Sequence, residues 1–146
     1  MRRIAILSGL LACSCSGQKA VRDDLRIKAM LATVERHVTT CTASTGRLGP
    51  LIARNERKAL MNAAIDARNR CSDARAEIAR TIGHDTALDS CRRDVDAQEK
   101  ISIAQLTVLD DPTPEGRAAV LQRLDEAIPL QQACGQAINK LRRGEP

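Results

Sequence analysis

The stretch ARNERKALMNAAIDARNRCSDARAEI, residues 53–78, carries mostly small and aliphatic side chains at alternating steps of four and three residues. This spacing puts them on one face of an α-helix and forms the heptad seam of helices packed side by side. The seam comprises Ala53, Arg57, Leu60, Ala64, Ala67, Cys71, Ala74 and Ile78. The stretch therefore predicts a long helix from about Pro50 to Ile82, whose alanines allow a neighbouring helix to approach closely.

Three further segments show apolar residues at helical spacing. They lie at about 21–41, 86–109 and 114–141. Composition predicts a loop at 42–49, and Thr113 or Asp111 followed by Pro114 predicts the start of the last helix. Pro129 should kink or split that helix. Four helices with short connections predict an all-α fold, either an antiparallel four-helix bundle or two linked helical hairpins.

Composition narrows the possible partners. The 146 residues include no Phe, Tyr or Trp, and the formal net charge is only +5. A core without aromatic side chains must use aliphatic residues, alanine and cysteine, which favours closely packed helices. Nucleic-acid binding calls for a clustered basic face, commonly with aromatic stacking platforms. We therefore expect no nucleic-acid partner, and a single helical domain over residues 21–143.

Four cysteines fall one to each predicted helix, each on the apolar seam: Cys41, Cys71, Cys91 and Cys134. In an exported domain such an even set predicts two disulfides. Four cysteines allow three pairings. A rise of about 1.5 Å per residue places Cys91 and Cys134 near the same height, and Cys41 far from all the others. The favoured pairing, Cys41 with Cys71 and Cys91 with Cys134, requires the early part of the second helix to bend or slide.

The N-terminus supports export. Arg2 and Arg3 precede an apolar run over residues 4–12, which is long enough for a secretory signal and too short to cross a bilayer. The run ends in Leu10-Leu11-Ala12-Cys13, which resembles the lipobox of bacterial lipoproteins. A non-lipidated secreted protein, or a buried apolar N-terminus, is the alternative reading of this run.

The lipobox resemblance implies that residues 1–12 are a cleaved signal peptide and that Cys13 carries the lipid, with residues 13–20 as a polar tether. Two or more acyl chains there would anchor the protein stably to a membrane. Ser14 after the lipidated cysteine points to the outer membrane, facing the periplasm. The membrane, through Cys13, and another envelope protein are the expected partners.

Few residues suggest a chemical site. His37 and Cys41, four residues apart on one helix face, could give two ligands to a soft metal, whereas His84 lies in a predicted turn without neighbouring ligands. No Cys-x-x-Cys, phosphate loop or nucleophile elbow is present in the sequence, so no cofactor is expected. Metal or small-ligand binding by a periplasmic helical bundle is the alternative function.

Carboxylates interleaved with arginine and lysine are typical of a solvated, salt-bridged helix face. This pattern covers Asp94, Asp96, Glu99, Asp125 and Glu126. A catalytic carboxylate needs burial to shift its pKa, and nothing in the pattern buries these five. We therefore expect no enzyme but a lipid-anchored envelope protein with a structural or protein-interaction role, such as an inhibitor, an immunity-type protein or an assembly component.

Overall fold

The computed structural model describes residues 15–83 and 86–145, with side chains from Asp23 onward in the first helix. All of its elements are helical within these ranges. They are α1 (Cys15–Gly46), α2 (Leu48–Ala53), α3 (Arg57–Ile82), a 3₁₀ turn η1 (Thr86–Leu88), α4 (Asp89–Asp110) and α5 (Pro114–Arg142). The predicted all-α, disulfide-bridged bundle is confirmed.

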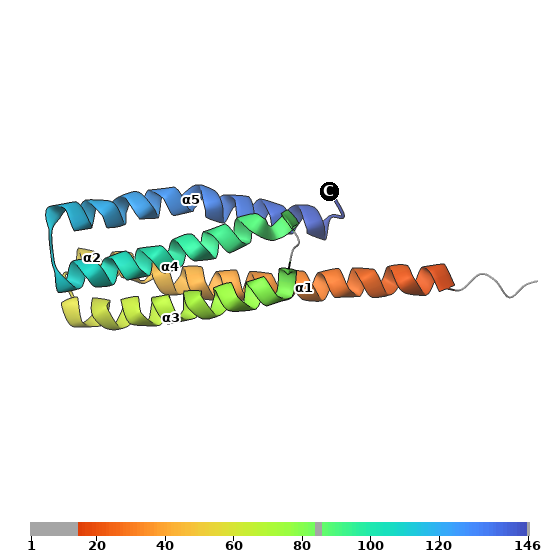
Figure 1. Ribbon diagram of the computed structural model, residues 1–146, viewed down its shortest axis with the longest axis horizontal. Coiled ribbons are helices and arrows are strands. Elements are labelled where there is room, and N and C mark those ends of the chain that lie inside the picture. The colour runs from red at the N-terminus through yellow and green to blue at the C-terminus, as the bar shows by residue number, and fades with distance from the viewer. Residues whose placement is uncertain (1–14, 84–85, 146) are drawn as a thin grey trace, which may run out of the picture.

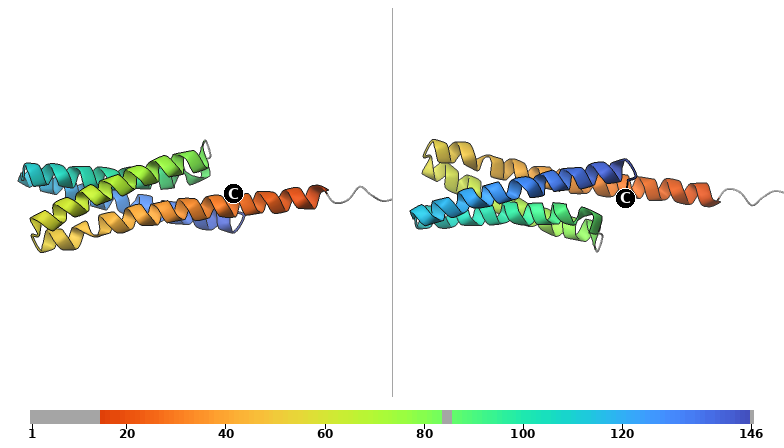
Figure 2. Two further views of the ribbon diagram at one scale, coloured as in Figure 1. Left: turned by 90° about the horizontal axis from the view of Figure 1, so that it is seen from below. Right: turned by 90° about the horizontal axis from the view of Figure 1, so that it is seen from above.

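The long helices run up and down beside one another (Figure 1). The end that holds both hairpin turns, 54–56 between α2 and α3 and 111–113 between α4 and α5, is called the apical end below. At the opposite, basal end α3 and α5 end and α4 begins, and the start of α1 extends beyond it (Figure 2). Neighbours in sequence pack together, α1 on α3, α3 on α4 and α4 on α5, while α1 and α5 touch only sparsely.

Composition predicted a loop at 42–49, but the first hairpin turn does not lie there. Helix α1 continues to Gly46 and α2 follows almost directly. Ser44 and Thr45 are buried. The hydroxyl of Ser44 donates to the carbonyl of Cys41 at 2.7 Å, and that of Thr45 donates to Oε1 of Gln98 on α4 at 2.7 Å. Both hydroxyls are therefore satisfied without a break in the helix. The segment is therefore helical despite its loop-like composition, because packing buries its hydroxyl residues.

The chain instead reverses at Asn55, which has a φ of 56°. The amide of Asn55 donates to the carbonyl of Ile52 at 3.1 Å, and the amide of Glu56 to that of Leu51 at 3.2 Å. These two bonds around a left-handed residue form a Schellman motif, in which asparagine is the usual substitute for glycine. The predicted single helix 50–82 is therefore wrong: a chain reversal at 54–56 divides it into two helices, where the favoured cysteine pairing had required only a bend or slide.

The second hairpin turn is as predicted. Thr113 caps α5, with its hydroxyl accepting from the amide of Gly116 at 3.0 Å, and Pro114 occupies the first turn. Pro129 does not split α5, which remains one helix through it and arches gently (Figure 1). Pro129 is exposed, so water can reach the carbonyl that lost its amide partner.

Two clusters of buried side chains fill the bundle. The basal core holds both disulfides and consists of Leu31, Val34, Val38, Cys41, Cys71, Ala74, Ile78, Ile82, Leu88, Cys91, Val95, Cys134 and Ile138. The apical core has no disulfide and consists of Leu48, Leu60, Ala64, Ile101, Leu109 and Ala127. The predicted seam of the second long helix is buried from Leu60 to Ile78, whereas Ala53 and Arg57 are exposed.

The first helix starts earlier than predicted and extends past the other helices. It begins at Cys15, so residues 15–20, expected as a polar tether, are helical. Every side chain from Asp23 to Ala29 is exposed, and Figure 1 shows this part of α1 projecting from the basal end. Within the described residues, no helix is long and apolar enough to span a bilayer.

Candidate functional site

Cys13, the predicted lipid attachment residue, lies outside the described residues, as does His84. The four cysteines of the predicted helix seams form the favoured pairs, with Cα atoms 4.6 Å apart for Cys41–Cys71 and 4.4 Å apart for Cys91–Cys134. Each bridge joins the two sides of one hairpin, α1 to α3 and α4 to α5. The two predicted disulfides are confirmed.

The position of the hairpin turn explains why Cys41 reaches Cys71. Cys41 precedes Asn55 by 14 residues (55 − 41), and Cys71 follows it by 16 (71 − 55). Two antiparallel helices rise equally per residue, so residues at similar distances from the turn lie at the same height. With the turn placed at 42–49, the two heights disagreed. The move of the turn to 54–56 removes that mismatch.

His37 and Cys41, the pair considered for a metal, cannot act together as ligands, because Cys41 forms a disulfide. The sulfur of Cys41 is bonded to that of Cys71 and so is not a thiolate, which is the form that binds metals. The Nε2 atom of His37 lies 3.4 Å from Nη2 of Arg36. Over the described residues, no three His, Cys, Asp or Glu side chains are grouped so as to hold a metal ion.

One of the carboxylates expected in a solvated face is fully buried. Asp94 has no exposed surface, and its Oδ1 accepts from Nε2 of Gln98 at 3.3 Å. Gln98 Oε1 in turn accepts from the hydroxyl of Thr45 at 2.7 Å, so the three side chains link α4 to α1. Asp94 Oδ2 has no hydrogen-bond partner within the described structure.

Burial raises the pKa of Asp94, because the charged form loses its hydration, and the hydrogen bond from Gln98 offsets only part of this effect. The prediction that Asp94 is solvated was therefore wrong. The polar chain is not cut off from the surface, since Thr45 and Gln98 also line a cavity of about 270 Å³ between α1 and α5. Its other walls are mainly apolar, including Ile101 and Leu124.

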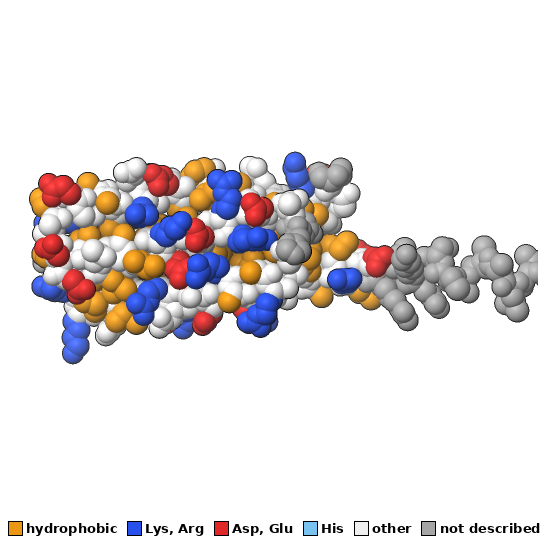
Figure 3. All heavy atoms as spheres, in the orientation of Figure 1, with side chains coloured by type: hydrophobic (Ala, Val, Ile, Leu, Met, Phe, Trp, Pro, Cys, Tyr) orange, Lys and Arg blue, Asp and Glu red, His pale blue; other side chains and the backbone are white. Residues whose placement is uncertain are grey.

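Asp96 and Glu99 form ion pairs as predicted, whereas Asp125 and Glu126 have none with the described residues. Asp96 pairs with Lys100 at 2.6 Å, and Glu99 with Arg75 on α3 at 3.2 Å. On the face shown in Figure 3, acidic and basic side chains intermingle along the whole bundle. The exposed Asp96–Lys100 pair contributes little to stability, whereas the Glu99 side chain is only 12% exposed.

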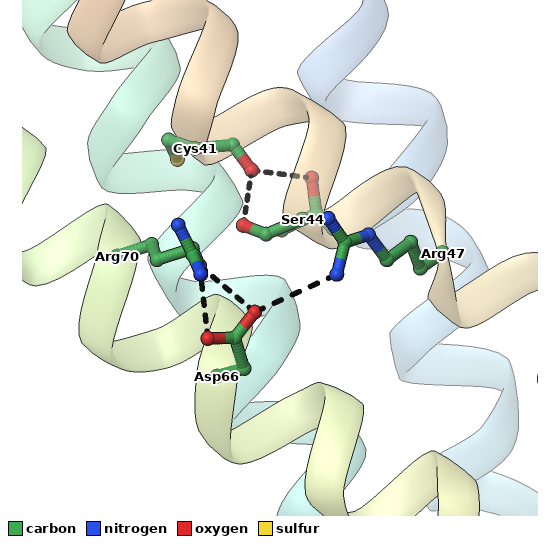
Figure 4. Close-up of polar contacts among 6 residues, drawn as sticks. Cys41, Ser44, Arg47, Asp66 and Arg70 are labelled. Carbon is green, nitrogen blue, oxygen red and sulfur yellow. Dashed lines mark hydrogen bonds and ion pairs between the residues drawn. The ribbon is translucent and has the colours of Figure 1, made fainter.

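A further ion-pair cluster supports the junction of α1 and α2. Asp66 on α3 accepts from Nε of Arg70 through both oxygens, at 2.8 and 2.9 Å, and lies 3.9 Å from Nη1 of Arg47 (Figure 4). Arg47 is the residue between the two helices. The cluster therefore connects the junction of α1 and α2 to α3, on the apical side of the Cys41–Cys71 bridge.

The apical end contains a cavity of about 320 Å³, which no pattern in the sequence predicts. It opens between the two hairpin turns, and its walls are mostly aliphatic. We call it the apical cavity; its lining is Ile52, Asn55, Arg57, Leu60, Gln105, Val108, Leu109, Pro112, Arg117, Val120 and Leu121. Its volume falls at the lower end of the range for small-ligand sites.

Arg57 holds one wall of the apical cavity in place. Its Nη2 donates to the carbonyl of Leu109 at 2.6 Å, which satisfies a carbonyl in the last turn of α4. Arg57 was predicted as a seam residue of a helix, whereas it is exposed and bridges the two hairpins at their tips. A cationic residue within an apolar seam, as at Arg57, is the signal that could have suggested this role.

Comparison with known proteins yields no relatives. The chain matches no protein-family model, no curated protein sequence and no solved structure.

Proposed function

We propose that this chain is a lipid-anchored protein of the bacterial cell envelope, and that its helical bundle has a non-enzymatic structural or protein-interaction role. The anchor would be Cys13 in the outer membrane, with the bundle facing the periplasm. A surface held out for another envelope protein fits an inhibitor, an immunity-type protein or an assembly component.

The observation that carries the proposal is the projecting start of α1. The helix begins two residues after Cys13, and all of its side chains from Asp23 to Ala29 are exposed. At about 1.5 Å per residue, the part from Cys15 to Ala29 measures roughly 20 Å. A helix of that length between a lipid and a bundle acts as a stalk that keeps the apical end away from the membrane.

The two disulfides support the same location. Structural disulfides form and persist in oxidising compartments, such as the periplasm, and are rare in the cytosol. Both bridges lie in the basal core, with every one of their cysteines buried. A lipobox-like stretch would direct the chain to the compartment in which these bridges form.

The test replaces Cys13 with Ser in the full chain and follows labelled palmitate and membrane fractionation. We expect the label and the membrane association to be lost together. Cys15→Ser is the matched control, because it removes the neighbouring cysteine and should leave both unchanged. A Cys13→Ser protein that still takes up palmitate, or stays in the membrane fraction, would contradict the anchor.

A further inference from the structure

We propose that the apical cavity binds the C-terminal end of a partner polypeptide, through an aliphatic side chain and the free carboxylate. The inference gives the proposed interaction role a site and a ligand, and it rests on that role for the nature of the partner. The lipid anchor takes no part in it.

The walls of the cavity select an aliphatic group. Six lining side chains are aliphatic, namely Ile52, Leu60, Val108, Leu109, Val120 and Leu121. Two of them remain accessible, Ile52 at 39% and Leu121 at 60% exposed. Covering such side chains contributes roughly 25 cal/mol per Å² of apolar surface. The chain has no aromatic residue, so the cavity offers no stacking platform for a ring.

The side-chain amide of Gln105 on the cavity wall is available to a polar group of a ligand. Gln105 on α4 is only 4% exposed and lines the cavity, yet its side chain forms no hydrogen bond within the described part of the chain. Its amide nitrogen and oxygen are not among the polar atoms that the described structure seals from water, so both are open to a ligand that enters the cavity. The amide both donates and accepts, as a peptide group does, so a bound peptide backbone can satisfy both of its ends.

The charge of the cavity selects a carboxylate. Arg57 and Arg117 contribute the only ionisable side chains of the lining, and both are cationic. Arg57 uses Nη2 for the carbonyl of Leu109, whereas Arg117 is exposed and has no ion pair with any described acidic residue. Guanidinium groups bind carboxylates in two-pronged geometry. Arg117 is therefore the main candidate for the terminal carboxylate.

A partner's chain end fits better than the chain's own ends or a fatty acid. The C-terminus and the start of α1 both lie at the basal end (Figures 1 and 2). A fatty acid would satisfy Arg117 but would place alkyl carbon against the Gln105 amide. Only a peptide supplies an aliphatic side chain, a backbone amide group and a carboxylate together.

The test measures binding to the full chain carrying Cys13→Ser, which needs no membrane. The probe is a short peptide with an N-terminal Trp, a Gly-Ser spacer and a C-terminal Leu-Val with a free carboxylate. Its fluorescence has no background from a protein that lacks Trp, Tyr and Phe. We expect saturable binding, weakened roughly tenfold or more when the peptide terminus is amidated.

Two substitutions assign the parts of the ligand. Arg117→Gln should weaken the free-carboxylate peptide roughly tenfold and abolish the preference over the amidated one. Gln105→Leu should weaken both peptides alike. Arg123→Gln, on the same helix outside the cavity, should change neither. Far-ultraviolet circular dichroism shows whether each variant is folded, and Arg117→Gln, at an exposed position, keeps the test valid if Gln105→Leu does not fold.

Three outcomes would overturn the proposal. They are no saturable binding of the peptide, equal binding of the acid and amide forms, and competition by decanoate at peptide-like affinity, which would assign the cavity to an acyl carboxylate instead. None of these bears on palmitate labelling of Cys13, so failure of the cavity proposal and failure of the anchor are separate results.

Discussion

The basal and apical halves of the bundle are built from the same four helices but are held together differently. The basal core contains both disulfides and most of the fully buried large side chains, among them Ile78, Leu88 and Val95. Among the large side chains of the apical core only Ile101 is buried to the same degree, and Leu60 and Leu109 line a cavity of about 320 Å³. The difference indicates a rigid basal half that carries an adaptable, ligand-accessible tip.

Removal of the bridges should affect stability most. Replacement of Cys91 and Cys134 together with Ser, or of Cys41 and Cys71, should each lower the free energy of unfolding by about 2 to 4 kcal/mol, because each bridge restricts the unfolded chain. Denaturant titration followed by circular dichroism measures this loss. Cys15→Ser is the control and should leave the denaturation midpoint unchanged. A bridge variant with the same midpoint as Cys15→Ser would refute the assigned role of the disulfides.

Truncation of core side chains should separate the halves next. Ile78→Ala in the basal core should cost about 3 kcal/mol, since a fully buried isoleucine leaves a cavity. Leu60→Ala should cost less, about 2 kcal/mol, because Leu60 already borders the apical cavity. The comparison uses the same denaturant titration. Equal losses at both sites would mean that the apical core is as tightly packed as the basal one.

Asp94 gives the bundle a pH dependence of its own. Its pKa is raised in the folded protein, so the neutral form is favoured there; its stability contribution is complete below the unfolded pKa and is lost as the pH rises through the folded pKa. Each unit of such a shift is worth about 1.4 kcal/mol. Asp94→Asn should flatten the decline of stability above pH 4. Asp96→Asn, which alters an exposed ion pair, should leave this decline as it is. A pH profile of Asp94→Asn that matches the wild-type profile would contradict this account.

The smallest effect is expected at the basal surface. Arg142 on α5 pairs with Glu35 on α1 at 2.8 Å, with both side chains at least half exposed. Glu35→Gln should therefore cost less than about 1 kcal/mol, and the loss should vanish in high salt. Melting temperatures at low and high ionic strength test this. A larger, salt-independent loss would show that this contact closes the sparse α1–α5 face.

The sequence was sufficient for the helical class, for a helix start at Pro114 and for two disulfides on the helix seams, because these follow from local spacing. Spacing alone did not decide the cysteine pairing, because the pairing depends on where the first hairpin turn lies. It misplaced the first hairpin turn, since Ser44 and Thr45 resemble loop residues until packing buries them. The signal for the true turn was Asn55, a residue type that tolerates the left-handed conformation.

The polar interior was missed for a related reason. The seam of α4 continues from Val95 through Gln98, Ser102 and Gln105, at the same steps of three and four residues. All three are buried, although none is apolar. A search for apolar periodicity stops at Val95, and only a search for seam positions of any type would have reached Gln98 and, beside it, Asp94. The apical cavity depends on how two hairpin tips diverge in space, which local spacing does not specify.

Native-state hydrogen exchange tests the central claim, a rigid basal half and an adaptable tip, most directly. In the oxidised protein, amides at 60–64 and 101–109 should exchange through openings of lower free energy than those at 74–82 and 91–95, which should approach the free energy of global unfolding. Uniform protection along the helices, or stronger protection at the apical end, would contradict the account.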